Sequence, residues 1–377
     1  MDQAFYNQLA MRSIADETLP RDRAWDILIS DTLKLLPLLN AAFEVRRAFF
    51  GHEVLIHILN NAQNGYCPED CRYCAQAKTS HASIEEYPLK SDEEILAEAK
   101  ESYEKGASCY CMVFAGRGPS QKRTEHLARL IRRIKSQYPS LEICVSAGLL
   151  DEEKAYVLKE AGLDRLNHNL NTSARHYPKI CTTHTYEDRL HTLKAARQAG
   201  LSICSGLIVG MGETAEDILE VAYTLREMNV ESIPVNFYMP IAGSGLGMGE
   251  FRRLHLSPEY CLRVLCVFRF LNPKAEIRMA AGRELYLRDM QVMGLYPANS
   301  LFLDGYLNAR GEARRRTLQM IQDAGFTIRS EYPLDELLDK EISSPEGGSP
   351  CRQPASQVPL KGWQELRPSA SLLDPRR

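Results

Sequence analysis

Short apolar runs alternate with longer amphipathic segments along most of the chain. Eight runs rich in apolar and β-branched residues predict strands, at residues 54–61, 109–116, 142–148, 164–171, 201–210, 232–240, 276–282 and 299–306. Nearly all are separated by segments with apolar residues at helical spacing, such as residues 91–106, 123–138, 151–162 and 186–200. Eight such repeats predict an α/β fold, a closed (β/α)8 barrel of the TIM type. A doubly wound open sheet is the alternative, which the count of eight disfavours.

Two segments lie outside this alternation. Residues 26–50 have apolar residues at helical spacing and are followed by a glycine, which predicts a helix within an N-terminal helical extension over residues 1–50. From residue 341 the chain is rich in proline and serine and has almost no periodic apolar pattern, so residues 341–377 are expected to form a disordered tail. The barrel is expected over residues 51–340.

Composition narrows the class of protein. The chain has 377 residues, 44% of them hydrophobic and 25% charged, as is usual for a soluble globular protein. Its net charge of −3 does not suggest nucleic acid or a membrane surface as the main partner. The N-terminus has no apolar signal core, so a cytoplasmic protein is expected.

Three of the 11 cysteines lie on one short loop, where Cys67, Cys71 and Cys74 form a C-x3-C-x2-C pattern among Gly, Pro, Glu, Asp and Arg. A structural zinc site needs a fourth ligand, and the nearest candidate, His81, is not part of a second ligand pair. An iron–sulfur cluster held by three cysteines keeps one iron open for a small molecule. The loop directly follows the first predicted strand, which places it at the mouth of the barrel where active sites occur.

This loop resembles that of the radical S-adenosylmethionine superfamily. The resemblance implies a [4Fe–4S] cluster on Cys67, Cys71 and Cys74, whose open iron binds the amino and carboxylate groups of S-adenosylmethionine. It also implies reductive cleavage of that cofactor to a 5′-deoxyadenosyl radical. Tyr73 matches the aromatic position near the adenine.

Other cysteines fall within predicted strands, namely Cys111, Cys144 and Cys204, and Arg278 lies inside another apolar run. A lone strand cysteine is usually a core residue, but a buried arginine needs a partner. Together with the ordered segments "GYCPEDCRYCAQ", "NHNLNTS", "ICTTHTYEDRL", "CSGLIVGMGET" and "IRMAAGRE", these residues closely resemble the biotin synthase family. The resemblance implies that the three cysteines and Arg278 hold an auxiliary iron–sulfur cluster, expected to be [2Fe–2S], which donates sulfur.

The implied reaction inserts sulfur between two unactivated carbons of dethiobiotin to give biotin. Such C–H bonds do not react with acids, bases or nucleophiles, so radical chemistry carried by a cofactor is needed. The resemblance further implies an external electron donor of the flavodoxin or ferredoxin type, the iron–sulfur assembly machinery as a partner, and a homodimer.

Roles of single residues also follow from the resemblance. Asn169 and Asn171 match residues that hydrogen-bond S-adenosylmethionine, and Arg189 matches the arginine that pairs with its carboxylate. Asn167 and Asn236 match amides that contact the flat ureido ring of the substrate.

The end of the site that holds the substrate's carboxylate tail departs from the family pattern. Two neighbouring threonines of the family are Asn308 and Ala309 here, and Arg310 is the candidate for the missing anion contact. A G-T-P-L pattern of the family is replaced by "GSGL" at residues 243–246.

Other interpretations remain open. Cys109 lies two residues before Cys111 and therefore on the same face of the strand, so it is either an extra ligand of the auxiliary cluster or a core residue. Cys181, Cys261 and Cys266 are expected to be core residues. The chain as a whole could be a related radical enzyme, such as an amino-acid mutase or a metallocofactor maturase, or a non-catalytic iron–sulfur protein.

Overall fold

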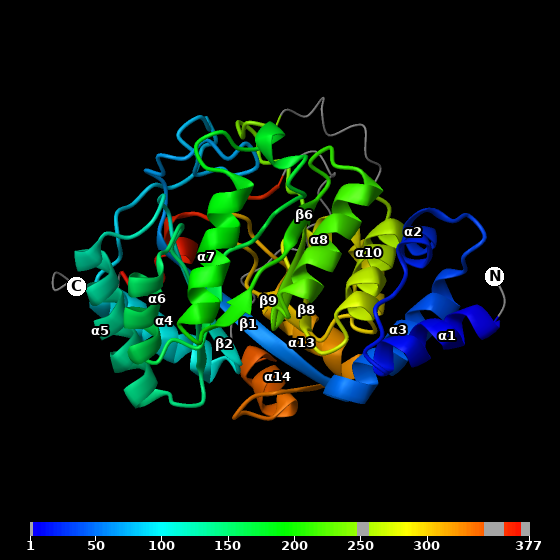
Figure 1. Ribbon diagram of the computed structural model, residues 1–377. Coiled ribbons are helices and arrows are strands. Elements are labelled where there is room, and N and C mark those ends of the chain that lie inside the picture. Colours follow the sequence, from blue (N-terminus) through cyan, green and yellow to red (C-terminus); the bar gives the residue numbers. More distant parts are fainter. Residues whose placement is uncertain (1–2, 247–255, 343–357, 371–377) are drawn as a thin grey trace.

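The computed structural model describes residues 3–246, 256–342 and 358–370 (Figure 1). At its centre β1 pairs in parallel with both β2 and β9, which closes the sheet into a barrel. Its strands are β1 (Glu53–Gln63), β2 (Cys109–Phe114), β3 (Glu142–Ser146), β4 (Arg165–Asn167), β5 (Ser202–Cys204), β6 (Leu207–Val209), β7 (Ser232–Phe237), β8 (Glu276–Met279) and β9 (Ser300–Leu303). Each of the eight predicted runs contains strand, and the predicted TIM-type barrel is confirmed.

The fifth predicted strand is divided into β5 and β6. Gly206 lies between them, where an added Cβ would lie 1.9 Å from the carbonyl oxygen of Pro234. Only glycine permits so close an approach to β7, and the chain leaves regular pairing there. β5 still pairs with β4 and β6 pairs with β7, so the barrel stays closed.

Helices cover the outside of the barrel. Most of the long ones begin at a side-chain N-cap, and Ser91, Thr185 and Thr214 each form a capping box with the acidic residue three positions on. The main helices are α4 (Asp92–Glu104), α5 (Gln121–Gln137), α6 (Glu152–Glu160), α7 (Tyr186–Gln198), α8 (Ala215–Glu227), α10 (Pro258–Leu271) and α13 (Arg314–Asp323). Shorter elements are η1 (Tyr177–Lys179), α11 (Arg283–Tyr286), η2 (Arg288–Met290), α12 (Gln291–Gly294), β10 (Thr327–Ile328) and α14 (Leu334–Ile342). Among the described residues, no helix combines the length and the apolar character needed to cross a membrane.

The N-terminal part contains three helices, α1 (Gln3–Ile14), α2 (Arg21–Ile29) and α3 (Leu35–Phe50), which lie beside α10 at one side of the barrel (Figure 1). The prediction of one continuous helix over residues 26–50 is wrong, because the chain breaks between α2 and α3. There Ser30 is extended and its hydroxyl accepts a hydrogen bond from the backbone N–H of Thr32, an alternative to helical bonding that serine often takes.

The C-terminal prediction is wrong for residues 358–370. This segment forms a bridge from Leu360 to Ala309 and contains α15 (Trp363–Leu366). Arg367 then donates two hydrogen bonds, of 2.9 and 2.7 Å, to the carboxylate of Glu94. Composition indicates disorder, but specific backbone pairing and a bidentate ion pair fix this stretch on the barrel. Residues 341 and 342 form the end of α14 (Leu334–Ile342), and the rest of the predicted tail, residues 343–357 and 371–377, lies outside the described residues.

Candidate active site

The three-cysteine loop directly follows β1 and lies at the C-terminal mouth of the barrel, as predicted. Gly65 and Tyr66 turn the chain away from the strand with positive φ angles of 81° and 55°. A short turn then forms in which the backbone N–H of Cys74 donates to the carbonyl of Cys71 at 2.9 Å. "GSGL" packs on this loop, because the N–H of Leu246 donates to the carbonyl of Arg72 at 2.9 Å.

The thiols of this loop fit a metal cluster. Burial raises the pKa of Cys74 to about 11, and the nearby Cys67 adds to the shift. A hydrogen bond to Cys181, followed by burial, raises the pKa of Cys71. The raised pKa values favour the neutral thiols, so binding of a metal cluster by these cysteines would release their protons.

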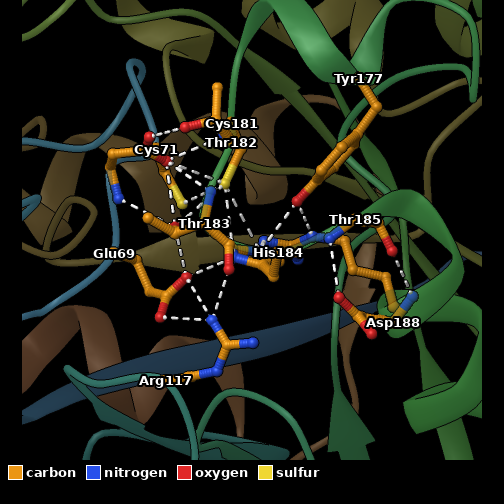
Figure 2. A network of polar contacts seen from close by, with 12 residues as sticks. Glu69, Cys71, Arg117, Tyr177, Cys181, Thr182, Thr183, His184, Thr185 and Asp188 are labelled. Carbon is orange, nitrogen blue, oxygen red and sulfur yellow. Dashed lines mark hydrogen bonds and ion pairs between the residues drawn. The ribbon is translucent and has the colours of Figure 1, made fainter.

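Cys181 is buried in the main core, as expected, but its thiol also has polar neighbours that the sequence did not indicate. Its Sγ lies 3.7 Å from Sγ of Cys71, 3.3 Å from Nδ1 of His184 and 3.3 Å from Oδ1 of Asp70 (Figure 2). Cys71, Cys181 and His184 could therefore hold a single metal ion. By contrast, Cys261 and Cys266 are buried in the aliphatic core on α10, as expected.

A hydrogen-bond network connects this loop to His184 and Tyr177 (Figure 2), and both of these contact Arg189. Glu69, between the first two cysteines, accepts from Nδ1 of His184 at 2.5 Å. Nε2 of His184 then accepts from Nη2 of Arg189 at 2.8 Å and from the Tyr177 hydroxyl at 2.9 Å. Because Nε2 accepts from two donors, the proton of the neutral imidazole lies on Nδ1, and Glu69 fixes that tautomer. Glu69, His184 and Tyr177 were not among the predicted site residues, although all three lie inside or beside segments that matched the family.

The residues predicted to bind the cofactor lie together at the mouth. Nδ2 of Asn171 donates to the Tyr73 hydroxyl at 2.6 Å, and Nη2 of Arg189 lies 3.3 Å from the same hydroxyl. Nη1 of Arg189 donates to the carbonyl of Asn169 at 2.7 Å. Asn171 takes a positive φ of 69°, a conformation that asparagine tolerates better than most residues. The arrangement brings a cation, amides and an aromatic ring together.

Inside the barrel, the strand cysteines form a group of their own. Cys109, Cys111, Cys144 and Cys204 pack with Ala280 and Phe302, apart from the main aliphatic core. Cys111 and Cys144 are direct neighbours across β2 and β3. Hydrogen bonds from Cys109 and Cys144 lower the pKa of Cys111, which favours the thiolate form that binds metal. The predicted association of Cys111, Cys144 and Cys204 is therefore present in the structure.

A buried ion network lies beside these thiols. Its anion, Glu276, was not among the site residues predicted from the sequence. Nη1 of Arg278 lies 3.7 Å from Sγ of Cys204, while its Nη2 donates to Oε1 of Glu276 at 2.5 Å. His57 Nε2 lies 2.7 Å from the same oxygen, and Arg165 pairs with the other oxygen of Glu276. Burial alone would raise the pKa of Glu276, but Arg278, His57 and Arg165 hold it well below its usual range. Glu276 and Arg278 are two residues apart on β8 and therefore lie on the same face of the strand. This spacing is the feature of the sequence that could have indicated the pair.

The predicted substrate residues differ in their surroundings. Nδ2 of Asn167 lies 3.2 Å from Sγ of Cys204 and 3.4 Å from Oδ1 of Asn169, between the interior thiols and the mouth. Asn236 is buried and its amide bonds the backbone of Leu207 and Ala281. Arg310 is exposed and pairs with Glu365 of the C-terminal segment at 2.8 and 2.5 Å. It also lines a cavity with Ala280, Phe302 and Tyr306, beside the interior thiols.

The sequence matches two known families. Residues 64–225 match the Radical SAM superfamily, and residues 234–327 match the Biotin and Thiamin Synthesis associated domain. A biotin synthase of Acaryochloris marina is 55% identical over 321 residues, which cover 85% of this chain and 91% of the relative. A biotin synthase of Magnetococcus marinus is 58% identical over 302 residues, covering 80% of this chain and 92% of the relative.

Solved structures share the fold at lower sequence identity. A crystal structure of methylornithine synthase has a TM-score of 0.74 at 21% identity and covers 87% of this chain and 98% of that chain. The FeFe-hydrogenase maturase HydG from Carboxydothermus hydrogenoformans has a TM-score of 0.72 at 19% identity, covering 88% of this chain and 80% of that chain. At such identities the likeness shows the barrel fold alone.

Proposed function

The chain belongs to the biotin synthase family, and we propose that it holds S-adenosylmethionine and dethiobiotin between two sets of cysteines, one at the mouth of its barrel and one inside it. It is a radical sulfurtransferase that converts dethiobiotin to biotin. The observation that carries the proposed arrangement is Asn167, whose amide contacts both Cys204 of the interior group and Asn169 at the mouth. Dethiobiotin held there would have its reacting carbons between the two metal sites.

The residues at the mouth bind and orient the first cofactor. Cys67, Cys71 and Cys74 hold the [4Fe–4S] cluster. The guanidinium of Arg189 pairs with the carboxylate of S-adenosylmethionine as a charge-assisted contact. Tyr73 would pack near the adenine, and Asn169 and Asn171 would hydrogen-bond the ribose and amino-acid part, the roles that the family match implies.

The residues of the interior hold the sulfur source and the substrate. Cys111, Cys144, Cys204 and Arg278 hold the auxiliary cluster. The family match assigns the ureido ring to Asn167 and Asn236, because an amide complements its donors and acceptor; in this structure the amide of Asn236 bonds backbone groups instead. When bound, the loop cluster and S-adenosylmethionine supply the 5′-deoxyadenosyl radical, and the auxiliary cluster supplies the sulfur. The barrel wall excludes water and other quenchers from the space between them.

The partners implied by this chemistry are part of the proposal. An external donor of the flavodoxin or ferredoxin type supplies electrons, and the iron–sulfur assembly machinery supplies both clusters. The auxiliary cluster is a [2Fe–2S] cluster, and the enzyme acts as a homodimer in the cytoplasm. Dethiobiotin is the substrate, as membership of the biotin synthase family implies.

Isotope transfer tests the proposed reaction. The reconstituted enzyme is incubated without oxygen with reductant, S-adenosylmethionine and dethiobiotin carrying deuterium at the methyl and the ring-side methylene. We expect biotin to form and deuterium to appear in 5′-deoxyadenosine, because those C–H bonds lose their hydrogen to the radical. Cleavage of S-adenosylmethionine without deuterium transfer or biotin would show that the barrel acts on another substrate.

The network behind Arg189 gives a prediction about cofactor binding. Replacing His184 by alanine removes the acceptor that orients Nη2 of Arg189. We expect the KM for S-adenosylmethionine to rise about 10- to 100-fold, the usual size of such supporting contacts, with iron content and kcat changed much less. His191→Ala, on the exposed face of α7, is the control. An unchanged KM would mean that His184 does not position Arg189.

Arg310 gives a prediction about the carboxylate tail. If Arg310 contacts that carboxylate, Arg310→Ala should raise the KM for dethiobiotin about tenfold, as expected for loss of one charged hydrogen bond. Glu365→Gln should lower the KM or leave it unchanged, because Glu365 pairs with the guanidinium of Arg310 and would compete with the carboxylate of the substrate for it. Steady-state kinetics of both variants give the KM for dethiobiotin. An unchanged KM in Arg310→Ala would show that Arg310 does not contact the substrate.

A further inference from the structure

We propose that the C-terminal strap, residues 358–370, competes with the substrate from within the molecule. It places the carboxylate of Glu365 on Arg310, the residue proposed to bind the carboxylate tail of dethiobiotin. The proposal rests on the proposed function only in assigning that tail to Arg310. The strap itself lies outside both family matches.

Backbone pairing places the strap against the turn that follows β9. Leu360 forms an antiparallel bridge with Ala309. Beside this bridge, the N–H of Arg310 donates to the carbonyl of Pro359 at 2.8 Å. In the family pattern, positions 308 and 309 carry the two threonines at the substrate's carboxylate tail. The strap is therefore paired with the part of the site that departs from the family pattern.

The side chains that replace the two threonines leave Arg310 as the candidate for the anion contact. The amide of Asn308 is engaged with that of Asn64 through two hydrogen bonds of 3.0 and 2.6 Å. Ala309 has no polar side-chain atom. Arg310 follows directly and lines a cavity together with Phe302, which packs with the interior thiols. A substrate whose ring lies near those thiols would thus direct its tail toward Arg310.

Glu365 holds Arg310 in the geometry that a substrate carboxylate would use. Its two oxygens accept from Nε and Nη2 of Arg310 at 2.8 and 2.5 Å, the two parallel bonds that a guanidinium forms with a carboxylate. The N–H of Gly362 also donates to Oε2 of Glu365 at 3.0 Å and fixes it at the start of α15. The residues that line the cavity include Arg310 but not Glu365. A substrate carboxylate therefore has to displace Glu365.

A second ion pair anchors the strap beyond Glu365. Arg367 donates to both oxygens of Glu94 at 2.9 and 2.7 Å, and its guanidinium lies 4.8 Å from the centre of the Trp363 ring. The side chains of Arg367 and Glu94 are 20% and 4% exposed, whereas those of Arg310 and Glu365 are 53% and 39% exposed. The exposed pair is the weaker contact and can exchange while the anchor holds. The anchor keeps Glu365 at a high effective concentration near Arg310.

The expected size of this competition follows from the exposure of the pair. An exposed ion pair corresponds to an equilibrium constant between about 1 and 5 for its formation. Only molecules in which the pair is open offer the guanidinium to the substrate, so the pair raises the apparent Kd for dethiobiotin about two- to sixfold. Removing the charge of Glu365 should therefore lower this Kd. A contact that only supports the site would give a higher or an unchanged Kd when it is removed.

Binding measurements on the reconstituted full-length protein test the proposal. The Kd for dethiobiotin is measured by titration calorimetry without oxygen, with S-adenosylmethionine present and reductant absent, so that no turnover occurs. The variants are Glu365→Gln, Arg367→Ala, Arg310→Ala and the double variant of Arg310→Ala with Glu365→Gln. The control is Glu336→Gln, which removes the charge from an exposed pair with Lys340 on α14. The methyl ester of dethiobiotin, which keeps the ureido ring and lacks the charged tail, is the second ligand.

We expect Glu365→Gln to lower the Kd for dethiobiotin about two- to sixfold, and Arg367→Ala to lower it by no more than that. The control should match wild type, the Kd for the ester should not change, and Glu365→Gln should have no effect once Arg310 is alanine. A Kd for dethiobiotin that is unchanged or higher in Glu365→Gln, or unchanged in Arg310→Ala, would overturn the proposal.

The test does not depend on a variant that fails to fold or on catalysis. Glu365 is exposed and glutamine has the same size, so Glu365→Gln decides even if Arg367→Ala does not fold. Biotin formation by the wild-type enzyme is assayed separately with reductant. Its absence would refute the proposed function, whereas the pattern of Kd values would still decide whether the strap competes for Arg310.

Discussion

Replacing Glu276 by glutamine is expected to destabilise the metal-free protein by about 3–5 kcal/mol, the usual result of removing one partner from a buried ion network. Glu276 is fully buried, and its two oxygens bind His57, Arg165 and Arg278 from three other positions of the barrel wall. Glutamine keeps the size of the side chain but removes the carboxylate with which the buried guanidinium of Arg278 pairs, while Arg165 keeps its second partner, Glu142. We therefore expect a lower denaturant midpoint in an equilibrium unfolding experiment.

Glu231→Gln is the matched control for this measurement. Glu231 lines the same polar cavity as Glu276, but it pairs with Arg197 at the surface, and both side chains are about 40% exposed, at 38% and 41%. Exposed pairs contribute little, so a loss below about 1 kcal/mol is expected. Equal losses in the two variants would contradict the special role of Glu276.

The sign of the pH dependence follows from the lowered pKa of Glu276. A carboxyl whose folded pKa lies below its unfolded value stabilises the protein above the unfolded pKa, and that contribution is lost as pH falls through the folded pKa. The difference between wild type and Glu276→Gln should therefore persist through neutral pH and shrink only in acid. A difference that disappears near neutral pH would mean that another group titrates there.

Replacing Cys71 by alanine is expected to abolish S-adenosylmethionine cleavage and to remove about four irons per chain, the content of one [4Fe–4S] cluster. The matched variant is Cys181→Ala, because its thiol is also buried and lies 3.7 Å from that of Cys71. Of these two cysteines, only Cys71 belongs to the C-x3-C-x2-C loop. Cys181→Ala should therefore keep the cluster and the cleavage activity.

Iron analysis and the release of 5′-deoxyadenosine distinguish these two cysteines. If Cys181→Ala also loses the loop cluster, Cys181 and His184 take part in holding or assembling it. If Cys71→Ala retains the cluster, the loop does not bind it through these three thiols, and the assignment of the mouth site is wrong.

The barrel itself could be predicted from the chain because its signals are local. Each strand carries its own apolar run, and most of the long covering helices carry their own apolar spacing and N-cap. The division between β5 and β6 could not be predicted, because it depends on how closely Gly206 approaches Pro234 on another strand. The packing of residues 358–370 was missed for a similar reason, since Arg367 finds its partner Glu94 far away in the sequence.

The chemistry was predictable where residues are close in sequence or match a known family. Cys67, Cys71 and Cys74 form one motif, and Cys111, Cys144 and Cys204 follow from the family pattern. Cys181 was assigned to the core because 110 residues separate it from Cys71, its contact in space. Glu276 was overlooked because its importance comes from His57 and Arg165 on other strands.

The most direct test of the account compares the wild-type enzyme with Cys144→Ala, with Cys261→Ala as the control. Iron and sulfide per chain are measured after reconstitution without oxygen, and biotin is measured after incubation with dethiobiotin, S-adenosylmethionine and reductant. We predict that wild type holds more iron than one [4Fe–4S] cluster and makes biotin, whereas Cys144→Ala loses the excess iron and makes none while still cleaving S-adenosylmethionine. A single cluster in both proteins, without biotin from either, would contradict the account and assign the interior cysteines to the core.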